Sequence, residues 1–382
     1  MPSPRTIPAI QRVRDVSLRN PLPTPPPGMV SLAVGEPDFD TPKIIRDSMN
    51  DALNRGETHY SNQLGLIPLR EAIALQERRT HNPLTLDDVL VTHGGTAGLA
   101  ATILGLIQPG DVVAIEDPTY SLYRDLVAYA GGTVKSFTRD STGRLEPESL
   151  AEAVSNAKLV VVCQPSNPTG AIMNDADWMA IESATDDQQT LILSDEAYAN
   201  LVYDDLAFIS ILDRVNLAGR GILCQTFSKK FAMTGWRVGY LVGPPSIISS
   251  AATVHRTFNG SVNTAVQYAA LTALTEGQAD ADRMLETYAD RRIRMEHVLN
   301  DTDGLHATRP EGAFYYFCKY ADSRPSVEVA RAAAEAGVLV RPGREFGPAG
   351  EGFVRLSFAV GLDDIHEGIA RLGGILKLDG KH

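Results

Sequence analysis

The sequence is poor in the residues that define three kinds of protein. Only three cysteines occur among 382 residues, and they lie far apart without a Cys-x-x-Cys spacing, which favours neither a disulfide framework nor a zinc site. No run of about 18 apolar residues occurs, as a membrane-spanning helix would need. Lys and Arg number 35 against 47 Asp and Glu, and the net charge of −12 disfavours nucleic-acid and anionic-membrane partners. We therefore expect buried free thiols, a cytoplasmic location and a small-molecule substrate.

The apolar residues form short runs that alternate with amphipathic stretches. Hydrophobic residues make up 43% of the chain and charged residues 21%, which is typical of a globular protein with two domains at this length. Buried strands are predicted at 112–116, 159–163, 191–195, 222–227 and 240–242. A helix is expected from about 95 to 107. This alternation predicts an α/β fold with a mostly parallel central sheet flanked by helices.

The pattern changes after about residue 280. An arginine-rich helix is predicted at 282–299, followed by an aromatic strand at 312–319, a helix at 326–336, strands at 338–341 and 352–358, and a final helix. We expect a large domain at 39–280 and a smaller α+β domain that combines 1–38 with 281–382. The proline-rich segment 21–28 is expected to be a short extended linker.

Two loops at predicted element ends carry unusual residues. In the segment 93–97, Gly94 and Gly95 precede the predicted helix, and their backbone N–H groups suit an anion such as a phosphate, although a tight turn has the same pattern. Tyr120 follows the strand at 112–116 and is able to stack on a flat ring or to serve as a core residue.

Two further segments contain charged groups beside apolar runs. Asp195 ends the strand at 191–195, where a carboxylate needs a partner or cation to offset the loss of water. Lys229 follows the strand at 222–227, with Lys230 and Arg237 close by, and cationic neighbours lower the pKa of a lysine amine toward the reactive neutral form. Two adjacent lysines also occur at solvated helix ends.

Taken together, these segments resemble the class I and II aminotransferases of pyridoxal-phosphate (PLP) fold type I, the aspartate aminotransferase superfamily. The resemblance runs from Gly35-Glu36-Pro37-Asp38-Phe39 to Val354-Arg355-Leu356-Ser357-Phe358 and covers nearly the whole chain. Its most specific part is the block 228–239, in which the lysine is followed eight residues later by an arginine within Met-Thr-Gly-Trp-Arg.

The resemblance implies a role for each of these residues around PLP. Lys229 would form the Schiff base with the cofactor and carry the proton in catalysis. Asp195 would pair with the ring nitrogen, Asn167 and Tyr198 would contact the ring 3′-oxygen, and Tyr120 would stack on the ring. The phosphate would be held by Gly95, Thr96, Ala97, Thr226, Ser228 and Arg237.

Further residues would bind the substrate or the second subunit. Arg355 would form a bidentate pair with the substrate α-carboxylate, and Gly35 and Asn167 would lie against the substrate. Tyr60 would reach the phosphate of a neighbouring subunit, which implies a homodimer with shared active sites. The implied reaction is a ping-pong transfer of an amino group from an L-amino acid to a 2-oxo acid.

Departures from the family pattern leave the substrate open. Thr96 stands where some relatives that act on aspartate or prephenate have a lysine. Arg341 and Arg344 stand where many relatives have small or apolar residues, and either could face the active site or the surface. Phe258 could shape a side-chain pocket.

Two alternatives to transamination remain on this fold. Another PLP reaction, such as β-elimination by a carbon–sulfur lyase, a cyclisation or an oxidation, would use the same lysine. A non-enzymatic sensor module of a transcription regulator would need a basic DNA-binding segment, and we expect none before residue 35.

Overall fold

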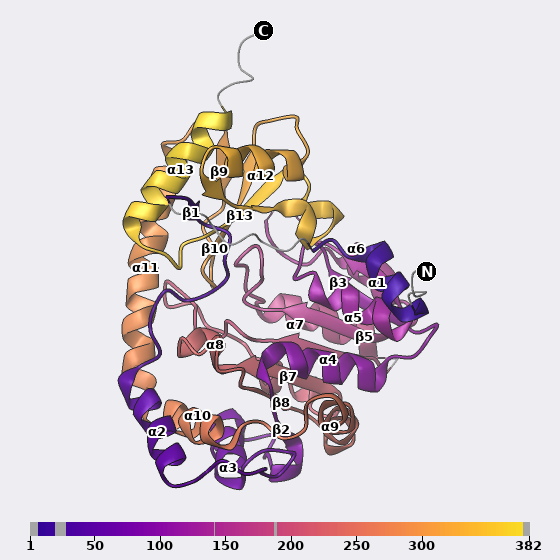
Figure 1. Ribbon diagram of the computed structural model, residues 1–382. Helices are drawn as coiled ribbons and strands as arrows, with labels where there is room; N and C mark the ends of the chain where they lie inside the picture. Colours follow the sequence, from indigo (N-terminus) through magenta and orange to yellow (C-terminus); the bar gives the residue numbers. More distant parts are fainter. Residues whose placement is uncertain (1–6, 20–27, 141, 187–188, 377–382) are drawn as a thin grey trace, which may run out of the picture.

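The computed structural model describes residues 7–19, 28–140, 142–186 and 189–376. It shows a large α/β unit with a smaller unit above it, linked on one side by a long helix (Figure 1). The linker expected at 21–28 lies outside the described residues, apart from Gly28.

A seven-stranded sheet forms the centre of the large unit. The strands are, in spatial order, β2 (Val89–Thr92), β8 (Gly239–Val242), β7 (Gly221–Thr226), β6 (Leu191–Asp195), β5 (Ala157–Cys163), β3 (Val112–Glu116) and β4 (Thr133–Phe137). All neighbouring pairs are parallel except those that β8 makes with β7 and β2. The prediction of a mostly parallel sheet is therefore confirmed.

Helices cover both faces of this sheet, which explains the continuous apolar runs of its inner strands. One face packs on α4 (Gly94–Leu106), α5 (Leu122–Ala130) and α9 (Pro245–Asn259). The other face packs on α2 (Lys43–Asn54), α3 (Ile67–Glu77), α6 (Pro147–Val154), α7 (Asp175–Thr185) and α10 (Thr264–Glu276). The one-turn helix α8 (Phe227–Lys230) directly follows β7.

The smaller unit contains two short sheets. Its antiparallel sheet has the order β12 (Arg341–Pro342), β13 (Phe353–Ser357), β10 (Tyr315–Tyr320) and β9 (Leu305–Ala307). The other sheet pairs β1 (Val30–Ser31) with β11 (Val338–Leu339). The helices α12 (Ser326–Glu335) and α13 (Leu362–Leu376) pack on these strands around a core of their own.

One helix connects the units, and another packs on the large unit. The helix α11 (Gln278–Asn300) is longer than predicted and runs from the large unit to the smaller one (Figure 1). The helix α1 (Pro8–Val16) lies on α5 of the large unit, where Arg12 Nε donates to Ala128 O at 2.9 Å. In the described part of the chain, no helix is long and apolar enough to cross a membrane.

The observed strands differ from the predicted ones in two respects. The single strand predicted at 338–341 is wrong, because Val338–Leu339 pairs with β1 while Arg341–Pro342 pairs with β13 in the other sheet. The strands β1, β2, β4 and β9 were not predicted. In the large sheet, β2 and β4 are the two outermost strands, and the first four residues of β4 are exposed or half-exposed, which weakens its apolar signal. The three cysteines are buried and free, as predicted.

Candidate active site

A cavity of about 290 Å³ lies where the carboxyl ends of the central strands meet the smaller unit. Ligands of open α/β sheets bind at this edge because loops from neighbouring strands converge there. It is lined by most of the residues singled out in the sequence: Gly35, Gly95, Thr96, Tyr120, Asn167, Asp195, Tyr198, Thr226, Ser228, Lys229, Arg237 and Arg355. Ala97 and Tyr60 are not among the residues that line it.

Lys229 presents a buried amine to this cavity. It lies on α8, whose first turn is capped by the Thr226 side chain, and its Nζ donates to Gly35 O at 2.6 Å. The pKa of Lys229 is lowered to about 8, chiefly by burial and also by the charges of Arg355 and Arg237, while Glu36 and Asp195 oppose the shift. The neutral, nucleophilic form of the amine is therefore far more abundant near neutral pH than in an ordinary lysine, while the ammonium form still predominates.

Asp195 is a buried carboxylate at the last position of β6. Its neighbours in register, Cys163 on β5 and Cys224 on β7, also end or nearly end their strands, so the loops that follow all open at this edge. Asp195 Oδ2 accepts from Tyr123 Oη at 2.7 Å, and Oδ1 accepts from Ala197 N at 3.2 Å. Burial raises the pKa of Asp195, and these hydrogen bonds lower it. The arrangement suits a cationic N–H group of a bound ring.

Arg355 lies on β13 among aromatic and amide groups. Its guanidinium stands 4.0 Å from the ring centroid of Tyr315 and donates to Asn167 Oδ1 at 2.8 Å and to Ala33 O at 2.7 Å. Its buried Nε has no hydrogen-bond partner. Because buried donors are normally satisfied, this atom marks a place for an acceptor from a ligand, such as a carboxylate oxygen.

Tyr198 and Gly35 close the space beside Arg355. Tyr198 Oη lies 2.8 Å from Tyr315 Oη, and either hydroxyl can donate. A Cβ at position 35 would collide with the Tyr315 hydroxyl, so only glycine lets the backbone approach this closely.

The first turn of α4 forms an anion-binding cradle with Arg237. Gly94 has φ +75°, and a Cβ there would lie 2.7 Å from Arg237 Nη2. The first turn of α4 contains no acidic residue, and no side chain caps it, so its N–H groups can bind a ligand. Thr226 Oγ1 donates to Ser228 Oγ at 2.9 Å on the opposite wall. Ala97 would contribute only a backbone N–H of this turn.

Tyr120 lines the cavity from the loop after β3. It contacts Tyr123 edge to face at 5.7 Å between ring centroids, and the guanidinium of Arg19 lies 5.6 Å from its ring centroid. Tyr120 is thus held as a flat wall of the cavity.

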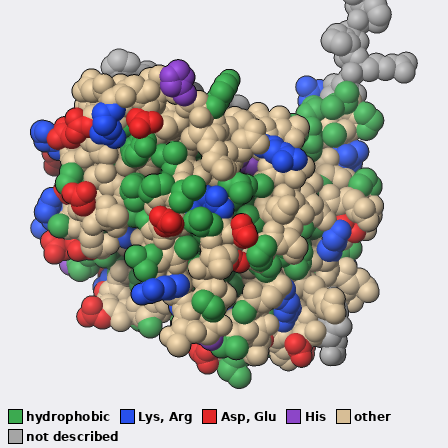
Figure 2. All heavy atoms as spheres, turned by 90° about the horizontal axis from the view of Figure 1, so that it is seen from below, with side chains coloured by type: hydrophobic (Ala, Val, Ile, Leu, Met, Phe, Trp, Pro, Cys, Tyr) green, Lys and Arg blue, Asp and Glu red, His purple; other side chains and the backbone are tan. Residues whose placement is uncertain are grey.

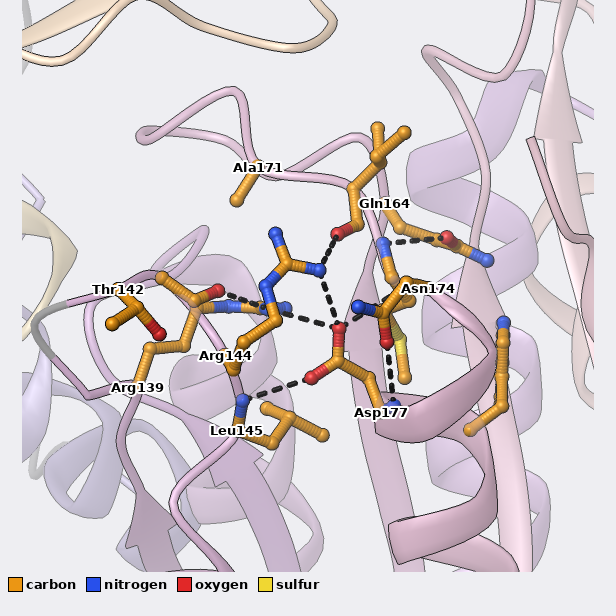
Figure 3. Close-up of polar contacts among 12 residues, drawn as sticks. Arg139, Thr142, Arg144, Leu145, Gln164, Ala171, Asn174 and Asp177 are labelled. Atoms are coloured by element: carbon orange, nitrogen blue, oxygen red, sulfur yellow. Dashed lines mark hydrogen bonds and ion pairs between the residues drawn. The ribbon is translucent and has the colours of Figure 1, made fainter. Parts of the chain in front are cut away.

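A partly buried polar network holds the loop that carries Asn167. The loop bonds to itself through Gly170 N to Ser166 O and Ser166 N to Ala171 O, both at 2.8 Å. Beyond it, Ile172 N donates to Glu311 of the smaller unit at 3.0 Å, and Arg144 reaches from Glu311 to Asp177. Figure 3 shows Arg144 and Arg139 converging on Asp177 beneath this loop.

The remaining residues whose positions the sequence left open lie partly inside and partly outside the cavity. Tyr60 is 97% exposed and Phe258 68% exposed, outside the cavity. Arg341 lines the cavity, whereas Arg344 is exposed and does not.

Sequence reasoning missed Tyr123, Tyr315, Arg19 and Glu345. Tyr123 lies one helical turn after Tyr120, and Glu345 follows Arg341 by four residues, so both spacings were visible. Their roles depend on contacts with residues from distant parts of the chain, and the sequence does not show these contacts.

The fold and the cavity define an α/β enzyme with a reactive lysine, a buried carboxylate and two arginine-based anion sites. The family model for aminotransferase class I and II matches residues 27–372. A probable aspartate aminotransferase of Methanocaldococcus jannaschii is 33% identical, with 91% of this chain and 92% of that protein covered. Aromatic-amino-acid aminotransferase 2 of Thermococcus litoralis is 34% identical, with 92% of each covered.

The solved structures agree with the sequence relatives. The aromatic aminotransferase of Pyrococcus horikoshii superposes with a TM-score of 0.89 at 32% identity, covering 97% of this chain and 99% of that one. This chain belongs to the class I and II aminotransferases. It is an amino-acid aminotransferase of a family that uses PLP and takes amino acids and 2-oxo acids as substrates.

Proposed function

We propose that this cavity binds PLP through Lys229 and transfers an amino group from an L-amino acid to a 2-oxo acid. The observation that carries the proposal is the buried Lys229 amine, with its lowered pKa, in one cavity with the Asp195 carboxylate and the anion cradle at α4. When bound, PLP supplies an electrophilic carbon for amines and a ring that accepts the electron pair released from the substrate Cα–H bond.

The residues around the cavity fit PLP. The cradle of Gly95, Thr96, Ala97, Thr226, Ser228 and Arg237 would hold the phosphate. Asp195 would bind the ring N–H, Asn167 and Tyr198 would donate toward the ring oxygen, and Tyr120 would cover the ring face.

Lys229 and Arg355 would act directly on the substrate, by proton transfer and by binding. Arg355 would bind the α-carboxylate through its guanidinium, including the Nε that has no partner in the protein. The neutral amine of Lys229 would take the proton from Cα and place it on the cofactor carbon in the same half of the reaction, and would move a proton the opposite way in the second half. Gly35, which has no Cβ, would let its backbone lie close to the substrate and to Tyr315.

We also propose a cytoplasmic homodimer. Large hydrophobic side chains are exposed on and near α2 and α3, including Leu53, Ile67 and Leu75 besides Tyr60 and Phe258. Figure 2, the view from below, shows a broad group of hydrophobic side chains across the middle of its face. Exposed apolar areas of this kind mark protein interfaces, and Tyr60 would extend from this surface to the phosphate of the partner subunit. The three free thiols suit a reducing compartment.

A division into residues 39–280 and residues 1–38 with 281–382 is part of this proposal. Pairing of Val30 with Val338, and the bond from Ser357 N to Leu32 O at 2.7 Å, support joining the N-terminal segment to the smaller unit. Since α1 lies on α5, the N-terminal segment also contacts the large unit, and its Arg19 lines the cavity. Such a connection suits closure on the substrate.

The test compares Lys229→Ala with Lys230→Ala. The neighbour Lys230 stacks on Phe231 and does not line the cavity, so it is the matched control. Borohydride reduction of the PLP-loaded wild-type protein, followed by peptide mapping, should place the cofactor mass on Lys229. Titration with L-amino acids and then with 2-oxo acids should remove and restore the visible cofactor absorption in the wild type and in Lys230→Ala only.

Other outcomes identify the alternatives. Turnover by Lys229→Ala would refute the role of that lysine. Release of ammonia with pyruvate or a thiol would indicate a β-elimination, and binding without turnover would indicate a sensor.

A further inference from the structure

The start of α4 is fixed by a residue from another helix. In α7 a capping box closes the helix start, because Asp177 at the third helical position accepts the backbone N–H of the N-cap residue Asn174. The corresponding position of α4 is Thr96, whose side chain is exposed and lines the cavity. The backbone N–H of the N-cap residue His93 has its acceptor on α9 instead.

His255 supplies this acceptor. The His93 backbone N–H donates to His255 Nε2 at 3.2 Å, and His93 Nδ1 lies at the same distance from that atom. A backbone N–H can only donate, so Nε2 of His255 carries no proton, and the neutral ring has its proton on Nδ1. Burial, together with the charge of His93, lowers the pKa of His255 to about 4, so the ring is neutral at neutral pH.

Two further contacts hold the same turn from the side of the sheet. Thr92 Oγ1, at the end of β2, donates to Gly94 O at 3.1 Å. A Cβ at Gly239 on β8 would lie 2.9 Å from Gly95 N, so the backbone of β8 packs directly on the turn. The sheet therefore holds the carbonyl of Gly94, and α9 holds the N–H of the residue before it.

The acceptor on α9 is uncharged, which matters beside an anion site. A capping box usually presents a carboxylate to the N-cap N–H. A carboxylate one residue before the anion-binding turn would repel a phosphate, and this repulsion is strong where water is excluded. A neutral imidazole accepts the bond without that repulsion. The N–H groups of the following residues, which the helix itself cannot satisfy, remain for the ligand.

We propose that His255 is a positioning residue for the cofactor phosphate, because it takes the backbone N–H of His93 and so holds the first turn of α4 in its anion-binding shape. The inference rests on the proposed function, since it takes that turn and Arg237 as the phosphate cradle. His255 does not line the cavity, so it acts on the ligand only through the turn. Loss of the bond lets the turn shift relative to Arg237, and the phosphate then loses hydrogen bonds while the ring keeps its contacts.

The test compares two ligands that differ only in the phosphate. PLP and pyridoxal are titrated into the full-length protein after removal of its cofactor, and the visible absorption gives a dissociation constant for each. The ratio of the two constants isolates the contribution of the phosphate. The variant His255→Met has a similar volume but only a weak acceptor. It should bind PLP about tenfold more weakly, as expected for hydrogen bonds to a charged group, with pyridoxal binding unchanged.

Two amide variants separate the acceptor from the bulk of the side chain. The amide of glutamine reaches about as far from the backbone as Nε2 of histidine, whereas the amide of asparagine reaches about as far as Nδ1. His255→Gln should therefore restore most of the PLP affinity, and His255→Asn should bind PLP as weakly as His255→Met. A merely structural role of His255 does not predict this order. If His255→Met does not fold, the Gln and Asn variants make the same comparison.

Ile248→Ala is the matched control for stability. Ile248 lies on the same helix and is 2% exposed, so its truncation lowers the melting temperature, but its ratio of PLP to pyridoxal affinity should equal that of the wild type. An equal loss of both ligands in His255→Met would overturn the inference. Full PLP affinity in that variant, no recovery in His255→Gln, or a changed ratio in Ile248→Ala would do the same. Failure of the proposed function has a different signature, because then borohydride would fix neither ligand on Lys229 of the wild type.

Discussion

Asp177 joins three parts of the large unit, and its removal should destabilise the protein strongly. The side chain is 3% exposed and accepts hydrogen bonds from Leu145 N at 2.9 Å, Asn174 N at 3.1 Å and Arg144 Nη1 at 2.9 Å (Figure 3). The bond to Asn174 is half of the capping box that begins α7, and the bond to Leu145 fixes the segment before α6.

The cost follows from what each partner loses. Loss of a capping interaction costs about 1 kcal/mol. The buried N–H of Leu145 left without an acceptor costs about 1–3 kcal/mol. Arg144 is 30% exposed and keeps Glu311, so its loss adds less than about 1 kcal/mol. We expect Asp177→Ala to lower the free energy of unfolding by about 3–4 kcal/mol, and Asp177→Asn, which keeps one acceptor oxygen, by about 2 kcal/mol.

Urea unfolding followed by circular dichroism measures both variants against Asp175→Ala. Asp175 lies in the same first turn of α7 and pairs with Arg214, but its side chain is 67% exposed, so its replacement should cost less than about 1 kcal/mol. A cost for Asp177→Ala below about 1 kcal/mol, or no greater than that of Asp175→Ala, would refute the reasoning.

Three further outcomes are expected. Gly35→Ala should raise KM for the amino acid and destabilise the protein by about 1–3 kcal/mol, because its Cβ collides with Tyr315; unchanged kinetics and melting temperature would contradict this. Trp178→Ala should lower the free energy of unfolding in urea by about 3–5 kcal/mol, since the ring is fully buried. A decrease below about 1 kcal/mol would contradict the observed packing. Burial, together with the charge of His93, lowers the pKa of His255 to about 4 from 6.5, so the folded state loses stability as pH falls below 6.5. Melting curves at pH 7.5 and 5.5 measure the loss of folding stability between these two pH values. This loss should be about 1 kcal/mol smaller in His255→Asn than in the wild type, and an equal loss would refute the reasoning.

The sequence predicted the central strands because burial on both faces requires unbroken apolar runs. The five predicted strands appear as β3, β5, β6, β7 and β8, with bounds shifted by at most two residues. The outer strand β4 was missed because exposed and half-exposed residues interrupt its apolar pattern, whereas the outer strand β2 is short and buried at all four positions. The split of 338–341 between two sheets was not predictable, since each half is defined by a partner strand far away in the chain.

Local sequence likewise determined which residue types meet at the edge of the sheet. A carboxylate at the end of one apolar strand and a lysine after the next must open on the same side when the strands are parallel, so Asp195 and Lys229 could be paired from the sequence alone. Only the tertiary structure decided that Arg341 faces the cavity and Arg344 faces solvent. The pairing of β12 with β13 sets the face to which Arg341 points, and Arg344 lies in the 3-10 turn that follows the strand; no local pattern encodes this contact between distant strands.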